Sequence, residues 1–226
     1  MDLIQALAAE LGKDPRHVEN VVHLLDEGNT IPFIARYRKE LHGAMDDTSL
    51  RTLEERLQYL RGLEERREAV KKSIDEQGKL TDELTAAIDS AKTLAEVEDL
   101  YRPYKQKRRT RATMAKEKGL EPLAALLFAQ ERDCPRPEEA ARDFVDPEKG
   151  VETVEDALQG ASDIIAEQIS DDAAIRKSLR ALISRQGQLV SRAATEDDSV
   201  YRLYYDFTQS VARLQGHQVL AINRGE

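Results

Sequence analysis

One segment of the sequence, residues 101–118, concentrates side chains that could bind phosphates. It carries eight basic residues and one acidic residue, a formal charge of +7 in a chain of 226 residues whose net charge is −9. Its basic residues are Arg102, Lys105, Lys107, Arg108, Arg109, Arg111, Lys116 and Lys118. Tyr101 and Tyr104 stand among them. Cationic and aromatic side chains together suit a phosphate backbone and unstacked bases, with affinity from counterion release and little sequence specificity.

This pattern predicts a nucleic-acid-binding surface in the first part of the segment. The expected contacts are Arg102, Tyr104, Lys105, Lys107, Arg108, Arg109 and Arg111. The other interpretation is a solvated basic loop that pairs with carboxylates of neighbouring helices. The 43 acidic side chains outnumber the 34 basic ones, so a phosphate partner would be repelled at long range, although salt confines that repulsion to about 8 to 10 Å. Charge alone does not separate the two interpretations.

A second, weaker candidate lies at residues 30–39, TIPFIARYRK. On a helical wheel Arg36 and Lys39 fall on the polar side, so both join the expected nucleic-acid contacts. Arg38 falls at the edge of the apolar face. An arginine at such a position is more often a half-buried partner in an ion pair than a contact to nucleic acid.

Other kinds of chemistry are not indicated by the sequence. The eleven glycines are scattered, so neither a dinucleotide fingerprint nor a P-loop exists. The four histidines and the single Cys134 lack the spacing of a zinc site or a nucleophile. Acidic doublets at 46–47 and 171–172 directly precede helical patterns, where carboxylates cap free N–H groups. We therefore expect no enzyme activity, no cofactor and no metal site.

The elements that hold these segments are predicted to be helical. Aromatic residues make up only 5% of the chain and charged residues 34%, and apolar residues recur every three or four positions. We expect an all-α, multi-helix bundle with a helix-turn-helix-like unit, formed by helices at about 15–27 and 31–41 around a turn at Gly28. The longest helix is expected at 47–77, roughly 45 Å at about 1.5 Å per residue. It is either the spine of the bundle or the seam of a coiled-coil dimer.

The remaining helices are expected to be shorter and separated by proline or glycine. We place them at about 3–11, from 81, and at 93–102, 111–118, 121–131, 136–145, 151–169 and 172–186. The helix at 172–186 should bury Ile175, Leu179, Leu182 and Ile183. Beyond residue 188 the pattern weakens, and residues 201–207 and 219–222 suit either a strand or a helix. The whole of 1–226 is expected to be one helical region, with sub-units at 1–45 and 46–226.

The location of the protein is inferred by elimination. The N-terminus shows no signal peptide and no stretch is apolar enough for a membrane span, so no membrane partner is expected and a cytoplasmic location follows. A single cysteine excludes a disulfide within the chain.

Several motifs resemble a known family. Residues 29–40 (NTIPFIARYRKE) and 100–123 (LYRPYKQKRRTRATMAKEKGLEPL) closely resemble the N-terminal region of the Tex family of bacterial transcription accessory proteins. Residues 204–207 (YYDF) and 220–226 (LAINRGE) are similar to later markers of that family. The resemblance implies a larger protein, in which an RNase-H-like domain, a helix-hairpin-helix region and an RNA-binding OB fold follow. Those domains are absent from this chain, and no catalytic residue carries over.

Two functions are expected from these observations together. The leading one is a non-catalytic module of a transcription accessory protein that binds RNA or DNA nonspecifically through the basic segment. The alternative is a helical scaffold that docks the transcription machinery or other domains of its own chain, in which case the basic segment would meet an acidic protein surface.

Overall fold

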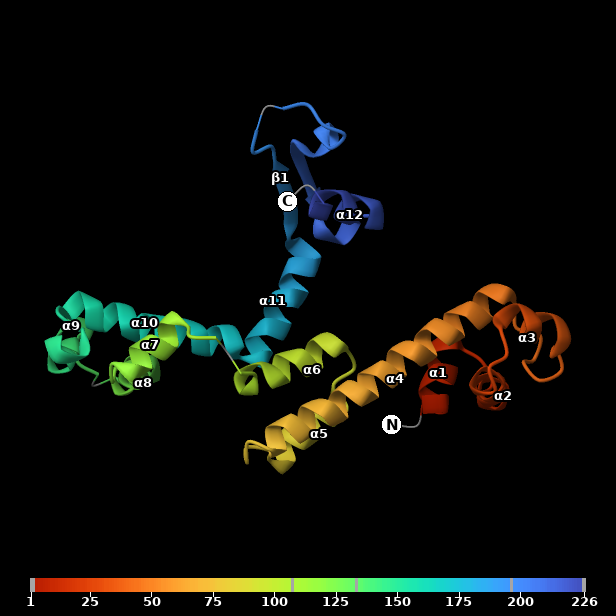
Figure 1. Cartoon of the computed structure of the whole chain (residues 1–226), viewed down its shortest axis with the longest axis horizontal. Helices are drawn as coiled ribbons and strands as arrows, with labels where there is room; N and C mark the ends of the chain where they lie inside the picture. Colours follow the sequence, from red (N-terminus) through yellow and green to blue (C-terminus); the bar gives the residue numbers. More distant parts are fainter. Residues whose placement is uncertain (1–2, 107, 133, 196, 225–226) are drawn as a thin grey trace. The chain divides into compact units, whose positions relative to one another are not determined.

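The protein is predominantly helical, as the sequence predicts. The computed structural model describes residues 3–106, 108–132, 134–195 and 197–224. Within these residues there are twelve α-helices and one two-stranded sheet. The chain divides into two compact units, Met1–Glu98 and Asp99–Glu226 (Figure 1).

Unit 1 is built around one long helix. Its elements are α1 (Leu3–Leu11), α2 (Pro15–Asp26), α3 (Ile31–Tyr37), α4 (Asp47–Asp75), α5 (Asp82–Ser90) and the first part of α6 (Leu94–Tyr101). Helices α1, α2 and α3 pack against α4 (Figure 1). Their apolar stripes meet there, and Leu7, Val18, Ile34 and Leu53 are all fully buried.

Helix α4 confirms the predicted long helix and ends two residues before the expected limit. Asp46 caps it by accepting the backbone N–H of Ser49 at 2.6 Å, as its carboxylate predicts. The apolar positions from Leu50 to Ile74 are buried in the monomer, so α4 serves as the spine of a bundle and offers no open dimer seam. Arg67 lies among these buried apolar residues although it is charged, and it is only 2% exposed. Its guanidinium donates to the Glu64 carboxylate and to the Ala91 carbonyl.

Helix α3 is shorter than predicted, because its expected last turn is not helical. The helix ends at Tyr37, and residues 39–44 form a turn in which Gly43 and Ala44 have φ values of 59° and 56°. The Asn20 side chain donates to the Leu41 carbonyl at 3.0 Å and fixes this turn against α2. Helices α2 and α3 are joined by a short turn around Gly28, and the helix-turn-helix-like unit stays a prediction.

Unit 2 contains the basic segment and a separate core. Its elements are the end of α6, η1 (Arg102–Tyr104), α7 (Arg111–Glu117), α8 (Glu121–Ala129), α9 (Pro137–Ala141), η2 (Arg142–Phe144), η3 (Pro147–Lys149), α10 (Val154–Asp171), α11 (Ala173–Gln186), β1 (Gln188–Arg192), η4 (Arg202–Tyr204), β2 (Asp206–Ser210), η5 (Val211–Arg213) and α12 (Gly216–Arg224).

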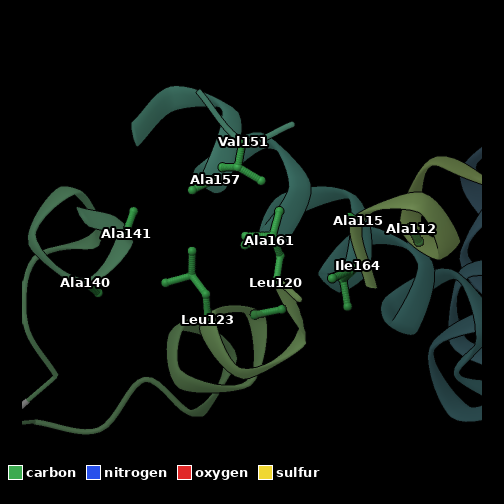
Figure 2. Packing of buried hydrophobic residues seen from close by; sticks show 11 residues of the cluster. Ala112, Ala115, Leu120, Leu123, Ala140, Ala141, Val151, Ala157, Ala161 and Ile164 are labelled. Atoms are coloured by element: carbon green, nitrogen blue, oxygen red, sulfur yellow. The ribbon is translucent and has the colours of Figure 1, made fainter. Parts of the chain in front are cut away.

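The core of unit 2 is formed by α7, α8 and α9 packed on α10 (Figure 2). Most of its buried side chains are alanines, among them Ala112, Ala115 and Ala161, which are each at most 4% exposed. Helix α10 begins at a capping box, in which Thr153 and Asp156 each accept the other's backbone N–H at 3.1 Å. Small side chains let helix axes come close to each other, so α7 and α10 pack closely.

Helix α11 differs from the prediction in its burial. It begins at Asp172, which accepts the N–H of Ile175 at 2.7 Å, as expected of a capping carboxylate. The apolar residues that were expected inside are exposed instead. They are Ile175, Leu179, Leu182 and Ile183, at 39, 50, 43 and 54%. Periodicity identifies the apolar face of a helix but does not say that another element covers it.

The C-terminal part contains the sheet and a last helix. Strands β1 and β2 are antiparallel, with Val190 opposite Thr208. The ambiguous segment 201–207 is divided between η4 and the start of β2, and 219–222 belongs to α12. None of the described helices is both long and apolar enough to cross a membrane.

Candidate nucleic-acid interface

The basic segment connects α6 to α7 across the surface of unit 2. Arg102 and Tyr104 lie in η1, an irregular stretch follows, and α7 begins at Arg111. The expected contact Lys107 lies outside the described residues. Thr110 caps α7 by accepting the N–H of Thr113 at 3.0 Å, and its hydroxyl lies 3.0 Å from the Glu167 carboxylate. This hydrogen bond attaches the middle of the segment to α10.

The described cations of the segment are exposed to solvent. Arg102, Lys105, Arg108 and Arg109 are exposed, and Tyr104 is half-buried. The side chain of Arg111 is 80% exposed. These side chains therefore need little desolvation of their own before they meet a phosphate.

Part of the positive charge is neutralised by carboxylates, as the alternative interpretation expected. Arg102 pairs with Asp171 at 3.0 Å, Arg111 with Asp163 at 3.7 Å and Arg109 with Glu117 at 2.9 Å. Asp163 and Asp171 lie two turns apart on α10, and their side chains are only 17 and 13% exposed. An acidic row on α10 thus lies beneath the segment.

Two of the expected contacts in the segment have no such partner among the described residues. Lys105 and Arg108 are exposed, and neither forms an ion pair with any of the described residues. A groove of about 450 Å³ separates the segment from α10, with Arg102, Lys105 and Arg111 on one side and Asp163 and Asp171 on the other. A phosphate inside that groove would meet carboxylates. We define the outer rim of the segment as Lys105, which also lines one side of this groove, and Arg108, which does not.

The second candidate, residues 30–39, lies in unit 1. Arg36 is exposed near the end of α3, with its Cζ 6.0 Å from the centre of the Tyr37 ring. Lys39 is exposed but lies in the turn after α3, so the helical wheel did not apply to it. The predicted ion pair of Arg38 is wrong for the described residues: its Cζ lies 5.3 Å from the centre of the Phe33 ring, and it donates to the Tyr37 carbonyl at 3.2 Å.

Sequence reasoning missed two aromatic side chains at this place. Phe33 and Tyr37 are 36 and 56% exposed, and their ring centres are 5.3 Å apart. Their spacing of four residues, with Arg36 between them, was the available signal. Among the described residues no three histidine, cysteine or acidic side chains come together as a metal site would require.

Comparisons with known proteins place the chain in a family. The family model described as "Tex-like protein N-terminal domain" matches residues 1–75, and the one described as "Tex central region-like" matches residues 133–226. The basic segment lies between the two matched ranges.

Individual relatives match nearly the whole chain. "Protein tex" of Bordetella pertussis is 45% identical over 99% of this chain, and "Transcriptional accessory protein Tex" of Neisseria gonorrhoeae is 43% identical over all of it. Human "S1 RNA-binding domain-containing protein 1" is 31% identical and also matches all of this chain. The chain spans 28, 30 and 23% of these relatives, respectively. The motifs, the two family models and these relatives agree, and the chain belongs to the Tex family.

Proposed function

We propose that this chain is a non-catalytic, nucleic-acid-associated module of a transcription accessory protein, and that it contacts RNA or DNA nonspecifically at the basic segment. The observation that carries the proposal is the outer rim, where Lys105 and Arg108 are exposed and have no carboxylate partner among the described residues. The printed names of the relatives, which refer to transcription and to RNA binding, support the same role. A role in bacterial transcription would place the protein in the cytoplasm.

Local charge is what makes this contact feasible in an acidic protein. The exposed charges of the rim act over about 8 to 10 Å at physiological salt, so distant carboxylates repel a phosphate only weakly. Arg109 can exchange Glu117 for a phosphate at small cost, because a surface ion pair contributes only about 0 to 1 kcal/mol. Arg111 is 80% exposed and lies 3.7 Å from Asp163, so its guanidinium also stays accessible. About four phosphate contacts are therefore available.

Fluorescence anisotropy of labelled single-stranded RNA and duplex DNA at several salt concentrations tests the proposal. Contact with about four phosphates predicts a log–log salt slope near −3 to −4. The variant Lys105→Glu/Arg108→Glu removes the rim without touching a buried side chain. Its slope should be smaller in magnitude by about 1.5 to 2, and its affinity at low salt should fall at least about tenfold.

A matched control separates the local effect from net charge. Lys79→Glu/Lys92→Glu makes the same change of net charge at exposed positions of unit 1. It should leave both slope and affinity nearly unchanged. An equal loss in the control, or no binding by the wild-type chain at low salt, would refute the proposed contact.

The alternative is a protein-interaction scaffold, and one observation favours it. The exposed apolar row of α11, formed by Ile175, Leu179, Leu182 and Ile183, is of the kind that covers a partner surface. If the chain binds neither RNA nor DNA, the scaffold function is favoured, and the basic segment would then bind an acidic protein surface.

A further inference from the structure

The exposed end of α3 carries a cluster that the basic segment does not account for. We call Phe33, Arg36, Tyr37 and Arg38 the α3 platform. The opposite face of the same helix is core, since Ile31 and Ile34 are 3 and 0% exposed. The two aromatic rings therefore do not complete the core of unit 1. Phe33 and Tyr37 are instead 36 and 56% exposed, and Tyr37 is the more open of the two.

The charges of the platform differ from those of the arginines of α4. All five arginines of α4 form ion pairs with carboxylates: Arg51, Arg56, Arg61, Arg66 and Arg67. By contrast Arg36, Arg38 and the neighbouring Lys39 have no such partner among the described residues. Arg36 and Arg38 lie instead against the rings of Tyr37 and Phe33, at 6.0 and 5.3 Å. Three cations without carboxylates suit an anionic partner.

The platform is held in place before any ligand arrives. The turn that follows it is anchored by the hydrogen bond from Asn20 to the Leu41 carbonyl, and the His42 side chain is buried. Gly43 passes so close to the ring of His17 that an added Cβ would lie 2.2 Å from its Nδ1. A site whose backbone is fixed loses little conformational entropy on binding.

We propose that the α3 platform binds an unpaired base of single-stranded nucleic acid. The base stacks on the Tyr37 ring, and the adjoining phosphates meet Arg36 and Lys39. An exposed ring beside guanidinium groups is suited to a base that is not already stacked in a duplex, and it is tolerant of base identity. The proposal deepens the proposed function, on which it rests for nucleic acid as the ligand, but it uses different residues in the other unit.

The test compares a labelled oligouridylate with an abasic strand of equal length, both titrated with the whole chain. The wild-type chain should bind the oligouridylate more tightly. Tyr37→Ala should weaken that binding about tenfold, and leave both the affinity for the abasic strand and the salt slope unchanged. The control Phe128→Ala removes another exposed ring, 44% exposed on α8, and should have no effect.

The outcomes separate this proposal from the rim. If Tyr37→Ala acts and Lys105→Glu/Arg108→Glu does not, the rim is refuted and the platform stands. If Tyr37→Ala leaves binding unchanged, or weakens both strands equally, base stacking at the platform is overturned, and the exposed rings belong to a protein interface. No preference of the wild-type chain for the strand with bases would overturn it as well.

Discussion

The Asp99 carboxylate holds the beginning of α11 to α6. Its replacement by asparagine tests how much these contacts contribute to the free energy of unfolding. Its two oxygens accept from Arg176 and Arg180, both at 2.7 Å. The Asp99 side chain is only 6% exposed, whereas the two arginine side chains are 31 and 43% exposed. Charge-assisted hydrogen bonds contribute about 1.5 to 3 kcal/mol each. In Asp99→Asn the amide oxygen keeps one weaker bond, and water reaches both guanidiniums.

We therefore expect Asp99→Asn to lower the free energy of unfolding by about 2 kcal/mol, less than two full charge-assisted bonds. Urea denaturation followed by circular dichroism measures it. Glu117→Gln is the matched control in the same unit, because its pair with Arg109 is exposed on both sides, and it should cost at most about 1 kcal/mol. Equal losses in the two variants would refute the reasoning.

The contacts of Asp99 with Arg176 and Arg180 also predict a pH dependence of the stability. Burial alone would raise the pKa of Asp99, but the hydrogen bonds from Arg176 and Arg180 outweigh it and hold the pKa below its ordinary value. The folded-state pKa is thus lower than the pKa in the unfolded chain, about 3.9. The carboxylate therefore contributes fully to the free energy of unfolding above the unfolded-state pKa. This contribution is lost as the pH falls through the lower folded-state pKa. The deficit of Asp99→Asn should accordingly shrink in urea titrations below about pH 4.

Three further substitutions probe helix geometry, each by urea denaturation. Gly62→Ala should stabilise unit 1 by about 1 kcal/mol, because Gly62 is exposed within α4 and its added Cβ meets nothing within 4 Å; a loss would contradict the helix assignment. Gly160→Ala should instead destabilise unit 2 by about 1 to 2 kcal/mol, since its Cβ would lie 3.3 Å from that of Ala115 and 2.3 Å from Cδ1 of Leu120. Thr153→Ala should cost about 1 kcal/mol by opening the capping box, and an unchanged midpoint would argue against that cap.

The parts of the fold that were predictable are those that local sequence determines. Helix α4 was placed to within two residues because its cap and its apolar repeat are both read from neighbouring positions. The end of α3 was not, since it depends on the contact between Asn20 and Leu41, 21 residues apart. Strand β1 was missed for the same reason. It pairs with β2, whose first residue Asp206 lies 14 residues after its partner Arg192, and a five-residue strand carries too weak a pattern alone.

In the candidate interface, too, local features were predictable and contacts between distant residues were not. The charge of residues 101–118 is visible in the sequence, but its neutralisation is not. Arg102 meets Asp171 at a separation of 69 residues, so only the folded chain distinguishes paired cations from Lys105 and Arg108. The α3 platform was half predicted: Arg36 was chosen for its polar position, whereas the exposure of Phe33 and Tyr37 follows from where α3 packs and where it ends.

The apolar row of α11 also determines how this chain should behave in concentrated solution. Four large aliphatic side chains between 39 and 54% exposed favour self-association, and the net charge of −9 opposes it through mutual repulsion. Salt screens the repulsion and leaves the apolar attraction intact. The second virial coefficient measured by light scattering should therefore fall as sodium chloride is added, and Leu179→Lys/Ile183→Glu, which leaves the net charge unchanged, should restore colloidal stability.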